Sequence, residues 1–89
     1  MNKQFIIGKI EKTTDKAIFV QVREFYLYDD EVIFFNDGKK WFPLSQIEIF
    51  YNHLDNVIIE VPEWLLTKNK VTATYDRELI EEIIALLEE

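Results

Sequence analysis

Apolar and polar residues alternate along the first quarter of the chain, as they do in half-buried β-strands. In residues 4–12 and 16–24, the alternate positions in the middle of each stretch carry an aliphatic residue or glycine and fall on one face of an extended strand. The positions on that face are Ile6, Gly8, Ile10, Ile18, Val20 and Val22. Because the turn-forming segment 13–15 separates the two stretches, the pattern predicts an antiparallel β-hairpin. The next residues, Phe25–Tyr28, either prolong the second strand or begin a loop, and Asp29-Asp30 interrupts them.

The strongest short-range turn signal in the chain is the Asp37-Gly38 pair. It lies between two strand-like runs, 32–35 and 40–42, and glycine supplies the positive φ that a tight hairpin turn requires. The sequence therefore predicts a second hairpin that turns at residues 36–39.

Pro43 marks the end of the strand that follows this turn, because proline has no N–H to donate to a neighbouring strand. Residues 44–46 are predicted to form one 3₁₀-like turn. Two further strands are expected over residues 47–51 and 57–61, with a turn at 52–56 between them.

Two helices are predicted after the last strand. Pro62 suits the first position of a helix, where its missing N–H costs nothing, and this short helix is expected to run to about Lys68. Asp76 is a typical N-cap residue for a second helix over residues 77–88. Apolar residues recur there at the three-and-four spacing of a helix buried on one face. They are Leu79, Ile80, Ile83, Ile84 and Leu87.

The order of the elements predicts an α+β fold that is mostly β. Five or six short strands joined by short connections favour a small bent antiparallel sheet or an SH3-like barrel, since closure removes exposed edges. Its 89 residues have room for one hydrophobic core, so we expect a single domain over 1–89. Within it, the sheet or barrel takes 1–61, the short helix 62–69 and the C-terminal helix 76–88.

Charge is distributed unevenly along the chain, whose formal net charge is −7. Residues 1–24 carry a net charge of +2, residues 25–64 carry −6 and the remainder carries −3. The whole-chain balance argues against direct binding to a phosphate backbone, which needs a surface rich in Lys and Arg. An acidic patch would instead suit a basic protein surface. The chain shows no apolar run long enough for a membrane span and no signal-peptide pattern, so we expect a cytoplasmic protein.

The chain has few residues suited to catalysis. There is no cysteine, the single histidine is His53 and the single serine is Ser45, around which no nucleophile elbow is present. The usual zinc sites need several Cys or His ligands, and no glycine-rich phosphate loop occurs. We therefore expect no enzymatic activity, no metal and no cofactor.

Three binding hypotheses remain open. The first places a protein-binding patch on the acidic, tyrosine-rich segment of Tyr26, Tyr28, Asp29, Asp30 and Glu31. The second is a single-stranded nucleic-acid or replication accessory module that uses the first hairpin through Lys9, Lys12, Lys16 and Arg23. The third is a homodimeric structural or regulatory protein joined through the C-terminal helix.

Three segments of the chain resemble a group of small proteins encoded in bacteriophages, prophages and plasmids. They are the Lys-Ala-hydrophobic strand at 16–20, the Trp-Phe-Pro-Leu-Ser-Gln-Ile turn at 41–47 and the Pro-Glu-Trp helix start at 62–64. The resemblance covers roughly residues 10–68. This chain departs from the pattern at Leu44, where many members carry Lys, in the added Phe25–Glu31 stretch and in the C-terminal helix.

The resemblance implies a mobile-element context and no catalytic residues. We interpret the residues of the shared motifs as architectural, namely Trp41, Pro43, Ser45, Gln46, Pro62 and Trp64. The leading hypothesis is a non-catalytic phage or mobile-element accessory protein that acts by binding a host or phage protein with a basic surface. Such a domain would inhibit a host nucleic-acid-directed defence, such as a CRISPR effector, by occupying its basic surface.

Overall fold

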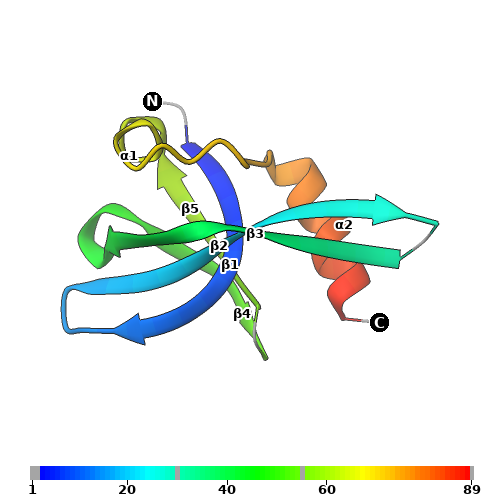
Figure 1. Ribbon diagram of the computed structural model, residues 1–89, viewed down its shortest axis with the longest axis horizontal. Coiled ribbons are helices and arrows are strands. Elements are labelled where there is room, and N and C mark those ends of the chain that lie inside the picture. Colours follow the sequence, from blue (N-terminus) through cyan, green and yellow to red (C-terminus); the bar gives the residue numbers. More distant parts are fainter. Residues whose placement is uncertain (1–2, 30, 55, 89) are drawn as a thin grey trace.

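The described residues form five strands and two helices, with a 3₁₀ turn between the third and fourth strands (Figure 1). The computed structural model describes residues 3–29, 31–54 and 56–88. The strands are β1 (Lys3–Thr13), β2 (Ala17–Tyr28), β3 (Glu31–Pro43), β4 (Glu48–His53) and β5 (Asn56–Pro62). The 3₁₀ turn is η1 (Leu44–Gln46), and the helices are α1 (Glu63–Lys68) and α2 (Arg77–Leu87).

All neighbouring strands of the sheet are antiparallel, and their order is β3-β2-β1-β5-β4. β3 and β4 form the two edges, so the described strands make an open sheet and not a hydrogen-bonded closed barrel. The expected α+β fold, with a small bent antiparallel sheet of five strands, a short helix and a C-terminal helix, is confirmed.

Both faces of the sheet are covered, because β1 and β5 are buried on two sides. Ile6 and Ile7 point to opposite faces, and neither side chain is exposed to solvent. The first core lies on one face of the sheet and is closed by α1; its members include Ile6, Ile18, Val20, Val22, Phe42, Ile59, Leu65 and Leu66. The second core lies under α2 and comprises Phe5, Ile7, Ile58, Ile80 and Ile83.

The two helix starts follow the capping chemistry in the sequence. Pro62 is the N-cap of α1 and not its first helical residue, with φ −65° and ψ 147°. Asp76 is the N-cap of α2, as expected, because its Oδ1 accepts a hydrogen bond from the Leu79 backbone N–H at 2.9 Å. The Asn69 side chain at the end of α1 reaches the β3 edge, where its Nδ2 donates to the Trp41 carbonyl oxygen at 3.4 Å.

The hairpin turn predicted at Asp37-Gly38 is wrong. β3 runs through these residues without turning, and the register shifts there because two residues of β3 face one of β2, Val22. Gly38 has φ +97°, so its conformational freedom makes a β-bulge. The buried Gln21 side chain fixes this bulge, because its Nε2 donates to the carbonyl oxygens of Gly38 and Val22, both at 3.0 Å.

The turn between β2 and β3 lies instead at Asp29, where the sequence indicated an interruption but no hairpin turn. Tyr28 pairs with Glu31 across the hairpin, and Asp29 has φ +47°, a left-handed conformation that Asp tolerates better than most residues. Phe25–Tyr28 therefore prolongs β2.

Candidate functional site

The end of the β2–β3 hairpin extends past the rest of the sheet. β2 pairs with β1 only as far as Arg23, which lies opposite Ile7. Its pairing with β3 continues from there to Tyr28 and Glu31. Residues 24–28 and 31–35 thus form a two-stranded ribbon, named here the hairpin tip, which lies in front of α2 in the view of Figure 1.

Tyr75 holds the hairpin tip where β1 and β2 separate. Its backbone pairs with Phe5 of β1 through two hydrogen bonds, Phe5 N to Tyr75 O at 3.0 Å and Tyr75 N to Phe5 O at 2.9 Å. Its hydroxyl accepts a hydrogen bond from the Phe25 backbone N–H at 2.7 Å. One residue therefore bridges the two strands after their own pairing ends. Burial raises the pKa of the Tyr75 hydroxyl, while the bond from Phe25 acts in the opposite direction.

One face of the hairpin tip packs against the second core. Phe25 and Phe34 lie opposite each other in an edge-to-face arrangement, with ring centroids 5.6 Å apart, and both contact the cluster that contains Ile80 and Ile83. The Arg23 guanidinium lies 5.6 Å from the centroid of the Phe34 ring. This packing supports a ribbon that would be marginal on its own, since an isolated two-stranded hairpin is barely stable in water.

The other face of the hairpin tip exposes large apolar side chains to solvent. The cross-strand pairs are Glu24 with Phe35, Tyr26 with Ile33 and Tyr28 with Glu31. We call these six residues the outer hairpin face. The exposed fractions of its apolar members are 47% for Tyr26, 67% for Tyr28, 37% for Ile33 and 55% for Phe35. The upstream residues on the same side of β2, Ile18, Val20 and Val22, are buried, so the apolar pattern of the core continues out to solvent.

Two contacts order the outer hairpin face internally. The Tyr26 and Phe35 rings meet edge to face with centroids 5.5 Å apart. The Tyr26 hydroxyl donates a hydrogen bond to Glu24 Oε1 at 2.6 Å, and this bond raises the pKa of Tyr26. The patch therefore presents a pre-arranged aromatic pair, which lowers the entropy that a partner must remove on binding.

Negative charge gathers around this patch. Residues 24–37 contain five acidic side chains and no basic one, and residues 77–88, which are α2 and its C-cap, carry a net charge of −3. Together these two packed segments carry −8, while the rest of the chain carries +1. The acidic excess thus lies in the hairpin tip, the residues that follow it on β3, and the helix beneath.

The structure brings together most of the residues predicted for protein binding. Tyr26, Tyr28 and Glu31 share the outer hairpin face, and Asp29 forms the turn beside them. Asp30 lies outside the described residues. Sequence reasoning missed Ile33 and Phe35, because the false turn at Asp37-Gly38 separated them from β2. Pairing Tyr28 with Glu31 would have placed them opposite Tyr26 and Glu24.

The basic residues of the nucleic-acid hypothesis divide into two groups. Lys9, Lys12 and Lys16 belong to the β1–β2 hairpin, which lies at the opposite end of β2 from the hairpin tip (Figure 1). Arg23 lies instead over Phe34, and its Nη1 donates to Asn56 Oδ1 at 3.4 Å.

The motif residues lie at the ends of strands. Pro43 ends β3 and precedes η1, to which Ser45 and Gln46 belong, and Pro62 ends β5. The two tryptophans are not core residues, since Trp41 is 45% and Trp64 48% exposed.

The apolar stripe of α2 faces the sheet of its own chain. Ile80 and Ile83 are buried in the second core, and Ile84 and Leu87 pack beside them. Leu79 is the stripe residue that remains well exposed. The helix-mediated dimer stays a prediction, and little of the apolar stripe is exposed for contact with a second copy.

Within residues 3–29, 31–54 and 56–88, no group of three or more His, Asp or Glu side chains is placed to hold a metal ion. No helix in this part of the chain has the length and apolar character needed to cross a bilayer.

Comparison with protein-family models, with curated proteins and with solved structures finds no match to this chain.

Proposed function

We propose that this chain is a non-catalytic binding protein of the cytoplasm, and that its outer hairpin face docks onto a basic surface of another protein. The observation that carries the proposal is the exposure of four large apolar side chains, Tyr26, Tyr28, Ile33 and Phe35, on one acidic ribbon. A contiguous exposed apolar patch with a polar rim is typical of a protein-interaction site.

The composition of the patch favours a protein partner. Aromatic anchors supply most of the binding energy in protein interfaces, and tyrosine is among the residues most enriched there. Glu24, Asp29 and Glu31 would meet Lys and Arg side chains at the rim and accelerate association with a basic partner. The same carboxylates would repel phosphate groups, so this face is unsuited to nucleic acid.

A nucleic-acid-directed nuclease is the class of partner that we favour. Its substrate channel is basic, and an acidic protein that occupies it would compete with the nucleic acid. The resemblance to proteins of phages and plasmids supports this class, because inhibition of a host defence nuclease would benefit a mobile element.

Affinity capture from bacterial lysate tests the proposal. Wild-type protein is compared with a Tyr28→Ala/Phe35→Ala variant and with a Glu31→Lys variant. Trp64→Ala is the matched control, since it removes an aromatic side chain of similar exposure from α1. A captured protein is identified by mass spectrometry, purified and titrated against each variant.

We expect the double variant to lower the affinity at least about 30-fold, as loss of a hot spot does. Glu31→Lys should slow association and reduce its dependence on salt, while Trp64→Ala binds as the wild type does. A partner that binds the double variant and wild type equally well would contradict the proposed surface, and a partner with an acidic contact surface would contradict the electrostatic part.

A further inference from the structure

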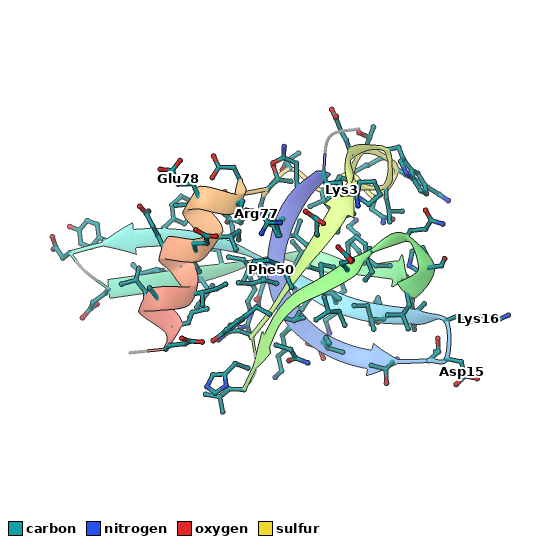
Figure 2. The ribbon with its side chains drawn as sticks, turned by 180° about the vertical axis from the view of Figure 1, so that it is seen from behind. Lys3, Asp15, Lys16, Phe50, Arg77 and Glu78 are labelled. Carbon is teal, nitrogen blue, oxygen red and sulfur yellow. The ribbon has the colours of Figure 1, made fainter. Side chains whose placement is uncertain are left out.

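A second surface lies at the other end of the sheet, on the face that α2 covers only in part. Lys16 lies at the end of the molecule away from α2 in Figure 2. Cross-strand pairing places Lys12, Phe19 and Trp41 in one row and Lys9, Gln21 and Lys39 in the next. Directly opposed residues of an antiparallel sheet point to the same side, so these two rows share a face.

Aromatic rings form the centre of this surface. The ring centroids of Phe19 and Trp41 are 4.8 Å apart, and the ring planes are inclined by 31°. Lys12 Nζ lies 5.8 Å from the centroid of the Phe19 ring. Because Trp41 is 45% exposed, much of its ring remains available to a flat ligand.

Three lysines surround these rings. Lys9 and Lys12 come from β1 and Lys39 from β3, on either side of β2, and Lys16 lies in the turn between β1 and β2. The ion pairs among the described residues join Glu60 to Lys3 and Arg77, so they engage none of these four lysines. The acidic neighbours along the chain are Glu11, Asp15 and Asp37, which leaves the surface slightly basic on a chain whose net charge is −7.

We propose that this face binds single-stranded nucleic acid, with a base stacked on Trp41 and phosphate groups held by Lys9, Lys12, Lys16 and Lys39. Stacking on an exposed aromatic ring together with a basic track is how proteins bind single strands without reading their sequence. A duplex hides the faces of its bases, so the rings would contribute nothing to its binding. We call the two rows of side chains the platform. It adds Phe19, Trp41 and Lys39 to the lysines expected from the sequence, and Arg23 is not part of it.

The platform is independent of the outer hairpin face. The residues at Phe19 and at Tyr26 point to opposite sides of β2 and lie near opposite ends of the strand. If the chain binds no nucleic acid, the proposed protein interaction is not contradicted. If no protein binds the outer hairpin face, the proposed nucleic-acid binding is not contradicted.

The expected binding is weak and strongly dependent on salt, because the net negative charge of the chain opposes it. Four phosphate contacts to a single strand give a slope of about −3 for the logarithm of affinity against the logarithm of salt concentration. Affinity should thus fall about 50-fold between 50 mM and 200 mM salt.

Tryptophan fluorescence provides a direct test. The chain has two tryptophans, so Trp64→Phe leaves Trp41 as the only one. In this background, a fifteen-nucleotide oligothymidylate is titrated at 20 mM NaCl, and quenching reports a base stacked on Trp41. Lys12→Glu/Lys39→Glu is compared with the matched control Lys3→Glu/Arg77→Glu, which makes the same charge change at two half-exposed residues beside Glu60, outside both rows.

We expect quenching of Trp41 by the oligonucleotide, and at least a tenfold loss of affinity in Lys12→Glu/Lys39→Glu but not in the control. Absence of quenching would overturn the proposal. So would an equal loss of affinity in both double variants, or equally tight binding of a duplex of the same length. Equal quenching by polyglutamate would assign the face to an acidic polypeptide and overturn the proposal as well.

Discussion

The hydroxyl of Tyr75 accepts a hydrogen bond of 2.7 Å from the backbone N–H of Phe25. The two residues are fifty positions apart, and the bond joins the segment before α2 to the hairpin tip. It forms where β2 has lost β1 as a neighbour, so it satisfies a backbone donor that the sheet no longer pairs. The position of the outer hairpin face therefore depends on this one side chain as well as on the packing of Phe25 and Phe34.

Replacing Tyr75 with phenylalanine removes this hydrogen bond and keeps the ring. We expect the free energy of unfolding to fall by about 1 kcal/mol, the usual net value of a hydrogen bond of this kind. Urea denaturation measures that loss, and amide hydrogen exchange locates it. The Phe25 amide should exchange faster than in the wild type through local opening. The Ile59 amide in the core should still exchange only through global unfolding. Unchanged exchange at Phe25 would contradict the role given to Tyr75.

Alkaline pH should destabilise the fold. Burial raises the pKa of both Tyr75 and Tyr51 above the ordinary value of 10.0. The folded state thus favours the neutral phenols, and their contribution to stability is present below pH 10 and is lost as pH rises through the folded-state pKa values. Urea denaturation at pH 8 and at pH values above 10 measures the change. In Tyr75→Phe the decline should be smaller, and stability that rises above pH 10 would contradict the account.

Gly38→Ala tests the bulge that replaced the predicted turn. The φ of +97° at Gly38 is one that residues with a Cβ rarely adopt, so alanine should cost about 1–3 kcal/mol of stability. Asp37→Ala is the matched control, since Asp37 is not among the described residues with positive φ. Thermal or urea denaturation compares the two variants. Equal stability of Gly38→Ala and wild type would rule out this backbone conformation.

Ile83→Ala tests whether the stripe of α2 belongs to the core of its own chain. Ile83 is 1% exposed in the second core, and truncation of such a residue costs about 2–5 kcal/mol. Glu82→Ala, one position away and exposed, should be close to neutral. Denaturation of both variants, with light scattering to measure mass, provides the comparison. An Ile83→Ala protein of unchanged stability that loses a dimeric mass would instead support the helix-mediated dimer.

Much of the fold could be predicted from local chemistry. Alternation in β1 and β2 identified the buried faces, Pro43 marked a strand end, and Asp76 marked the start of α2. Gly38 was misread because a positive φ serves a bulge as well as a turn, and only the partner strand distinguishes the two.

The site was predicted only in part for the same reason. Tyr26 and Tyr28 were found because they lie in an acidic, aromatic segment. Ile33 and Phe35 resemble ordinary core residues in the sequence. They are exposed because the hairpin tip extends beyond the last residue of β2 that pairs with β1. Nothing local to residue 75 indicates that its hydroxyl reaches Phe25, since that contact depends on the tertiary fold.

The central claim is that a protein partner covers the outer hairpin face. Site-specific photo-crosslinking in bacterial lysate tests it most directly, with p-benzoylphenylalanine in place of Tyr28 or, as control, of Trp64. The account predicts one dominant crosslinked protein from position 28, reduced by Glu31→Lys, and none of that protein from position 64. Crosslinking of the same protein from position 64 and not from position 28 would contradict it.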